Sequence, residues 1–86
     1  MVSSSAVTRE ALETFVIDAL AEQGAARERI GPDVSFDELG LDSLNVTDMG
    51  LSVKNEFGID VHPGDLEDAE NLRAALAVIY RKAGLG

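Results

Sequence analysis

Three stretches of the chain carry apolar residues at intervals of three and four, which is the spacing of one face of an α-helix. The positions are Leu12, Phe15, Val16, Ala19 and Leu20 in the first stretch, Val46, Met49, Val53 and Phe57 in the second, and Leu72, Ala75, Leu76, Ile79 and Ala83 in the third. A helix buries such a stripe only by packing it against another element. The pattern therefore predicts three amphipathic helices around one core.

Capping residues indicate where these helices begin and end. Thr8 is a suitable N-cap for the first helix, because its hydroxyl can accept a hydrogen bond from a free backbone N–H. Asp42 has the same role before the second helix, with Asn45 as its capping-box partner and Gly58 after the last turn. Asp68 is the candidate N-cap of the third helix.

The connections complete the predicted fold. The first connection, residues 25–41, is long, and its apolar anchors predict that it packs across the helices; they are Ile30, Val34, Phe36, Leu39 and Leu41. In the second connection, Pro63 can open a short helical turn through Leu66. No stretch alternates in the manner of a strand. We expect an all-α fold in one domain over residues 1–86, a four-helix bundle of three main helices and one short helix, with residues 1–6 as a disordered tail.

Composition narrows the classes of function. The 86 residues include 16 acidic and 7 basic side chains and no cysteine, for a net charge of −9. The absence of cysteine excludes disulfides, thiol nucleophiles and thiolate metal sites, and we expect no metal site. The negative charge argues against nucleic acid or an anionic membrane as a partner. No apolar run is long enough for a membrane span, and the first residues lack the pattern of a secretion signal. We therefore expect a cytoplasmic monomer.

The negative charge is concentrated in one stretch. Residues 33–70 contain eleven acidic side chains and a single basic one, Lys54, whereas the rest of the chain is nearly neutral. One interpretation is a solvated face that keeps the protein monomeric. The other is a docking surface for basic partners, where the field accelerates association and salt weakens it.

The segment from Ser35 to Leu44, with the sequence SFDELGLDSL, holds the candidate chemistry. A glycine-containing turn and an aspartate deliver Ser43 to the first turn of the second helix. A phosphate on that hydroxyl would face free backbone N–H groups and the positive end of the helix dipole, which is worth about 0.3–1 kcal/mol at an exposed site. The same residues also fit a helix cap without any further role.

The string LGLDSL, from Leu39 to Leu44, resembles the phosphopantetheine attachment motif of acyl carrier proteins. The resemblance covers nearly the whole chain, including the first helix, the long loop, the segment Glu56 to Ile59 and the last apolar stripe. It implies a carrier and not an enzyme. A phosphopantetheinyl transferase would move the 4′-phosphopantetheine arm of coenzyme A onto Ser43, next to the motif residue Asp42, and acyl groups would form thioesters on the arm. An acyl- or aminoacyl-loading enzyme, an acyltransferase or a ketosynthase would be the further partners. A hydrolytic pair of Ser43 with His62 is the enzymatic alternative, and the polar loop around His62 favours a solvated side chain.

The resemblance also implies a docking surface on the second helix and the loop before it. The matching positions are Asp37, Glu38, Asp42, Leu44, Thr47, Asp48, Leu51 and Glu56. The acidic residues would steer basic partners, and Leu44 and Leu51 would supply apolar contact.

Departures from the family pattern bear on the pathway. Asn45, Lys54 and Asn55 stand where fatty-acid carriers commonly have acids, and Gly50 stands where they have a bulky aliphatic residue. Glycine inside a helix costs about 1 kcal/mol relative to alanine, so Gly50 either permits close packing or leaves a space that widens the cleft for the acyl group. The pair before Ser43, Leu41-Asp42, resembles polyketide-type carriers. We expect a discrete acyl carrier of polyketide or related secondary metabolism, such as antibiotic biosynthesis; the alternatives are an aminoacyl, peptidyl or aryl carrier of nonribosomal-type biosynthesis, a fatty-acid carrier and an unmodified helical adaptor.

Overall fold

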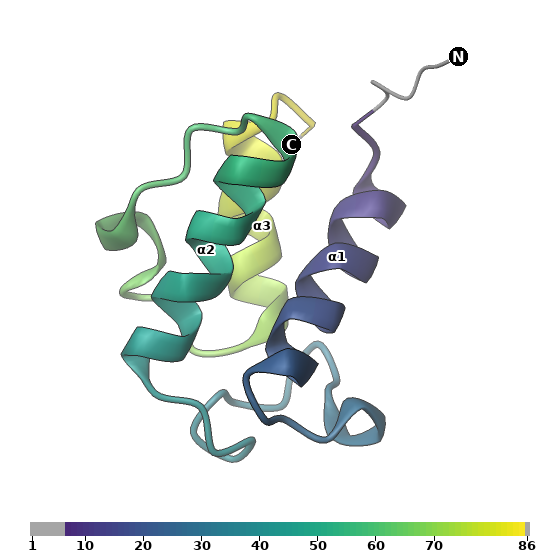
Figure 1. Ribbon diagram of the computed structural model, residues 1–86, viewed down its shortest axis with the longest axis vertical. Helices are drawn as coiled ribbons and strands as arrows, with labels where there is room; N and C mark the ends of the chain where they lie inside the picture. The colour runs from purple at the N-terminus through teal and green to yellow at the C-terminus, as the bar shows by residue number, and fades with distance from the viewer. Residues whose placement is uncertain (1–6, 86) are drawn as a thin grey trace.

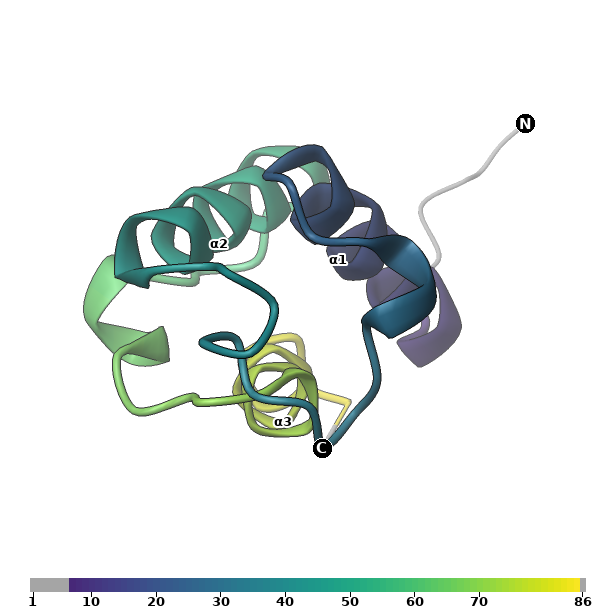
Figure 2. The same cartoon turned by 90° about the horizontal axis from the view of Figure 1, so that it is seen from below.

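The structure, a computed structural model, describes residues 7–85, so the predicted tail over residues 1–6 lies outside the described residues. The elements follow in the order α1 (Arg9–Glu22), η1 (Arg27–Arg29), α2 (Ser43–Phe57), η2 (Pro63–Leu66) and α3 (Leu72–Lys82). The three α-helices lie side by side, and the connection from α1 to α2 crosses one end of them (Figure 1). Viewed from that end, the helices surround a common centre (Figure 2).

The all-α fold of three main helices and one short helix is confirmed, and the short turn expected from Pro63 to Leu66 is present as η2, whereas the term four-helix bundle needs correction. The fourth helix, η2, is a four-residue 3₁₀ turn, so residues 7–85 contain three α-helices. Within the same residues the only strand-like pairing is an isolated bridge between Ser35 and Asn71. None of the described helices is long and apolar enough to span a membrane, and the described residues place no group of three potential ligands around a metal position.

Two of the predicted N-caps are present. The Thr8 hydroxyl accepts a hydrogen bond from the N–H of Ala11 at 3.0 Å. Asp42 and Asn45 form the complete capping box at the start of α2: the Asn45 N–H donates to Asp42 Oδ1 at 3.0 Å, and the Asp42 N–H donates to Asn45 Oδ1 at 2.9 Å. Gly58 ends α2 with φ +70°, a conformation that costs glycine little.

The expected cap of α3 was wrong. Asn71, not Asp68, is the N-cap, and its Oδ1 accepts a hydrogen bond from the N–H of Ala74 at 2.9 Å. The reason is tertiary: the Glu70 carbonyl accepts a hydrogen bond from the N–H of Phe36 at 2.8 Å, and Asn71 pairs with Ser35 in the isolated bridge. These contacts hold the chain extended through Asn71, so helical geometry begins only at Leu72.

The core consists of the three predicted stripes and the anchors of the connections. Buried side chains are Leu12, Val16, Leu20, Ala25, Phe36, Leu39, Leu41, Val46, Met49, Val53, Ile59, Val61, Leu66, Leu72, Ala75, Leu76 and Ile79. Phe15, Ala19, Phe57 and Ala83 are partly buried, as are the loop anchors Ile30 and Val34. Phe15 and Phe57 meet edge to face with ring centroids 5.2 Å apart, which joins α1 to the end of α2.

The long connection is attached to α3. The Arg73 guanidinium donates to both carboxylate oxygens of Asp33, at 2.9 and 3.1 Å. The backbone N–H of Arg73 donates to the Pro32 carbonyl at 3.0 Å. The loop is therefore packed, as its apolar anchors predicted, and the start of α2 emerges from an anchored segment.

Candidate functional site

Ser43 is the first residue of α2, and its side chain is exposed. The preceding chain turns at Gly40, whose φ is +77°, and the Leu41 N–H donates to the Phe36 carbonyl at 2.9 Å. Because Leu39 and Leu41 are buried on either side of this turn, the next two residues project outward. The local sequence thus presents the Ser43 hydroxyl to solvent at the helix N-terminus.

The first turn of α2 retains free donors. The N–H groups of Asn45 and Val46 are paired with the side chain and the carbonyl of Asp42, at 3.0 and 3.2 Å. The N–H groups of Ser43 and Leu44 have no acceptor among residues 7–85. These two donors and the helix dipole favour an anion at this point. A phosphodiester on the Ser43 oxygen therefore fits the site.

A groove of about 770 Å³ opens beside Ser43. It lies between the start of α2, the preceding loop and the segment that joins η2 to α3. Its lining residues are Ser35, Phe36, Asp37, Leu41, Asp42, Ser43, Val46, Thr47, Leu66, Glu67, Ala69 and Glu70. The apolar members are buried or half-buried and the carboxylates are exposed, so apolar side chains form the base of the groove and acidic groups surround it. Its volume is typical of a small-molecule site.

The structure brings four of the expected partner-binding residues onto one stripe of α2, where three are exposed and Thr47 is half-buried. They are Leu44, Thr47, Asp48 and Leu51, which follow the spacing of one helix face. Leu44 is 72% exposed and Leu51 is 40% exposed, and they are the large apolar side chains that residues 7–85 leave most exposed. Asp37 and Asp42 lie next to this stripe in the groove. We call Leu44, Thr47, Asp48 and Leu51 the α2 stripe.

Glu38 has an internal contact with Ser35, and the spacing of these two residues, serine followed three positions later by glutamate, is the sequence signal for it. Its Oε1 accepts hydrogen bonds from the N–H and the hydroxyl of Ser35, each at 3.1 Å, and the Ser35 hydroxyl accepts from the Glu38 N–H at the same distance. This reciprocal pair holds the turn that precedes Ser43. Glu38 therefore shapes the loop as well as adding charge to it.

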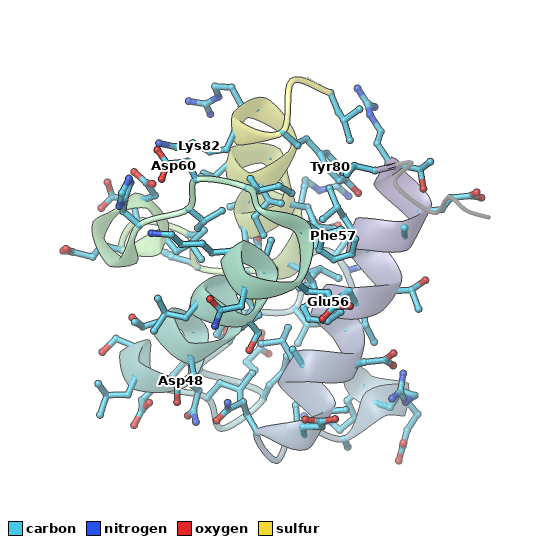
Figure 3. All side chains as sticks on the ribbon, turned by 45° about the horizontal axis from the view of Figure 1, so that its top comes forward. Asp48, Glu56, Phe57, Asp60, Tyr80 and Lys82 are labelled. Carbon is cyan, nitrogen blue, oxygen red and sulfur yellow. The ribbon has the colours of Figure 1, made fainter. Side chains whose placement is uncertain are left out.

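Glu56 is exposed but does not belong to the α2 stripe. It lines a second, shallower depression of about 470 Å³ with Glu10, Phe15, Asp18 and other residues of α1 and the end of α2. Figure 3 shows Glu56 and Phe57 on the side of α2 that faces α1, whereas Asp48 lies on a different side of the helix. The structure thus separates Glu56 from the other acidic residues expected to bind partners.

His62 is a solvated loop residue, as predicted. Its Nε2 lies 3.0 Å from Asp60 Oδ1, and both side chains are more than half exposed. Its backbone N–H donates to Asp65 Oδ2 at 2.8 Å. This hydrogen bond, with a second from Lys82, lowers the pKa of the Asp65 carboxyl. Within the described part of the chain, no hydrogen bond joins His62 to Ser43, so the geometry gives no support to a hydrolytic pair.

The sequence did not identify one side of the groove. Leu66, Glu67, Ala69 and Glu70 all line it, and they follow Ser43 by more than twenty positions. The helical pattern carries no signal for them, because it reports only which residues face the core within one element.

Comparison with known proteins agrees with a serine at the start of α2, where the helix favours an anion. A family model described as the phosphopantetheine attachment site matches residues 14–79. The acyl carrier protein of Nitratidesulfovibrio vulgaris strain Miyazaki F is 31% identical over 74 residues, which covers 85% of this chain and 93% of that protein. This chain belongs to the acyl carrier protein family.

Two further acyl carrier proteins are similar to this carrier. That of Solidesulfovibrio magneticus is 29% identical over 76 residues, covering 87% of this chain and 94% of its own. That of Chloroherpeton thalassium is 33% identical over 64 residues, covering 73% and 80% respectively. No solved structure gives a significant match to the carrier.

Family membership establishes the general activity. The carrier is not an enzyme: it holds a covalent 4′-phosphopantetheine and works with a phosphopantetheinyl transferase and with enzymes that handle acyl groups. The arm supplies the thiol on which acyl groups form thioesters, and this chain has no cysteine of its own. The chain's own task is to present the arm and to be recognised by those enzymes.

Proposed function

We propose that Ser43 is the residue that carries the 4′-phosphopantetheine arm, and that the groove beside it receives the first part of the arm. The observation that carries this proposal is the exposed Ser43 hydroxyl on the first turn of α2. Beside it lie the groove and the N–H groups of Ser43 and Leu44, which have no acceptor among residues 7–85. Asp42 fixes the start of the helix through its capping box, so the backbone of Ser43 is held on the first helical turn.

Partner enzymes dock, in this proposal, on the α2 stripe. Leu44 is the most exposed large apolar side chain of the described residues, and Leu51 lies two turns further along the same face. Asp48 on the stripe and the neighbouring Asp37 and Asp42 attract basic surfaces, while the leucines provide apolar contact once the partner has arrived. Glu38 and Glu56 add to the acidic field from beyond the stripe.

The pathway we propose is polyketide or related secondary metabolism. Its support is the pair Leu41-Asp42 before Ser43 and the low acidity of α2, whose only acidic residues are Asp48 and Glu56. Nonribosomal-type and fatty-acid carriers stay the alternatives. A cytoplasmic location and a monomeric state stay predictions.

The experiment is intact-mass analysis of the purified protein before and after incubation with coenzyme A and a broad-specificity phosphopantetheinyl transferase. We expect the mass to rise by one phosphopantetheine unit in the wild type and in Ser52→Ala, a matched variant of another serine on α2. We expect no gain in Ser43→Ala with unchanged helical circular dichroism. A gain in Ser43→Ala, or none in folded wild-type protein, would overturn the proposal.

A further inference from the structure

The side chain of Leu66 separates the groove from the core. Leu66 is the last residue of η2, and it lines the groove together with Ser43 of α2. It is also only 3% exposed and belongs to the buried core. One face of this side chain thus meets the groove, and the rest is packed inside the bundle.

Leu66 occupies the space that Gly50 leaves on α2. A Cβ atom at position 50 would lie 2.9 Å from Leu66 Cδ1 and 3.4 Å from Val61 Cγ1. The first distance is shorter than carbon atoms tolerate, since their optimal separation is about 3.5–4.0 Å. Leu66 therefore packs on the bare backbone of α2. Of the two roles expected for Gly50, close packing is the one observed, and the glycine does not widen the cleft.

Among the described residues, the core behind Leu66 is closed to solvent. Several core residues of α2, of α3 and of the loop between them are at most 2% exposed; they include Met49, Val53, Val61, Leu72 and Ile79. η2 packs against both α2 and α3, and Figure 2 shows the segment that contains it beside these two helices. A group that entered the bundle from the groove would have to displace the Leu66 side chain.

Hydrogen bonds hold Leu66 in this position. Its carbonyl accepts a hydrogen bond from the N–H of Ala69 at 3.1 Å. The neighbouring Asp65 carboxylate accepts from the His62 N–H at 2.8 Å and lies 3.1 Å from Lys82 Nζ on α3. η2 is thereby attached to α3, and moving the backbone of Leu66 outward would break these contacts.

We propose that Leu66, packed against Gly50, is the specificity-determining residue that closes the interior of this carrier to its acyl group. The inference rests on the proposed attachment at Ser43. The acyl group then stays in the groove, where it meets the carboxylates of Asp37, Glu67 and Glu70 as well as apolar side chains. Such a surface suits short or oxygen-bearing acyl groups. A long saturated chain gains no burial in the core and leaves its tail in water.

The test compares acetyl and octanoyl forms, prepared with the transferase and the corresponding acyl-coenzyme A. We expect the two thioesters of the wild type to hydrolyse at similar rates. Leu66→Ala opens the space beside Gly50, so the octanoyl chain can enter the core of this variant. We then expect the octanoyl thioester to hydrolyse more slowly than the acetyl thioester by about fivefold or more, because burial of the chain's methylenes favours the protected state. Leu12→Ala is the matched control: Leu12 is fully buried in α1 and does not line the groove, so its truncation should leave the two rates similar.

A second measurement uses only the wild type and so does not depend on how well Leu66→Ala folds. It compares the nuclear magnetic resonance spectra of the acetyl and octanoyl forms. The methyl signals of Val53 and Ile79 should be the same in the acetyl and octanoyl forms. Octanoyl protection or shifted core methyl signals in the wild type, or no chain-length dependence in folded Leu66→Ala, would overturn the role of Leu66. Failure of the Ser43 attachment is distinguishable, because it appears earlier as an absence of mass gain on loading.

Discussion

The carboxylate of Asp33 and the guanidinium of Arg73 form a two-point ion pair across forty positions of sequence, with hydrogen bonds of 2.9 and 3.1 Å. The pair joins the long loop to the first turn of α3. Next to it, the N–H of Phe36 donates to the carbonyl of Glu70, and both residues line the groove. Two walls of the groove are therefore tied to each other, although both side chains of the ion pair are exposed.

We expect Asp33→Asn to lower the melting temperature slightly at neutral pH, with an effect that disappears in acid. The hydrogen bonds from Arg73, with its charge, hold the pKa of the Asp33 carboxyl below its ordinary value, which is about 3.9. A carboxyl with a lowered pKa in the folded state stabilises the fold above its unfolded pKa and loses this contribution as pH falls through its folded pKa. The difference in melting temperature between wild type and variant should thus shrink below about pH 4. Asp37→Asn is the control, because the Asp37 carboxylate has no ion pair in the described residues. A difference that persists at the lowest pH would argue against the ion pair of Asp33 as its cause.

Asn71→Ala should lower the free energy of unfolding by about 1 kcal/mol, the usual cost of removing an N-cap side chain. Asn71→Asp retains an acceptor at the same position and should lose less. Asp68→Ala removes the cap that the sequence suggested, and as a surface change it should alter stability by no more than about 0.5 kcal/mol. Urea denaturation measures all three. If Asp68→Ala cost as much as Asn71→Ala, the assignment of the cap to Asn71 would be wrong.

Gly50→Val should destabilise the carrier by about 1–3 kcal/mol, because the added Cβ and its two methyl groups must displace Leu66 and Val61. In a Leu66→Ala background the same substitution should cost less or become favourable, because the added side chain fills the space that leucine leaves. The four proteins form a double-mutant cycle in urea denaturation. Additive effects would mean that residues 50 and 66 do not compete for one space.

Asp48→Lys should lower the kcat/KM of the phosphopantetheinyl transferase about threefold or more at low salt, because the proposed docking stripe loses a charge that attracts the partner. The difference from wild type should narrow as salt is added. Glu28→Lys makes the same change in charge on η1, which lies outside the α2 stripe, and should have a smaller effect. An effect of Asp48→Lys that is independent of salt would point to a lost local contact instead of steering.

The fold could be predicted from the sequence where the deciding interactions are local. The stripe of α2 and its capping box depend on residues three and four positions apart, so the pattern placed Asp42 and Asn45 correctly and put Ser43 on the first helical turn. The same locality predicted that Leu44 and Leu51 would be exposed. The motif around Ser43 lies within one such local unit.

The rest depends on contacts between residues far apart in the chain. Asn71 caps α3 because the loop at Ser35 and Phe36 holds the preceding residues extended, and a helical pattern carries no trace of that loop. Gly50 admitted two interpretations until Leu66 was seen to fill the space beside it.

By itself, then, the sequence determined which segments form the three main helices, where the first two of them begin and which serine stands at a helix N-terminus, because spacing and capping act over a single turn. Only the tertiary structure decided which residues line the groove beside Ser43 and where the groove ends. Those features arise when the segment from Leu66 to Glu70 packs against the start of α2, and packing depends on the shapes of side chains that meet only in the folded protein.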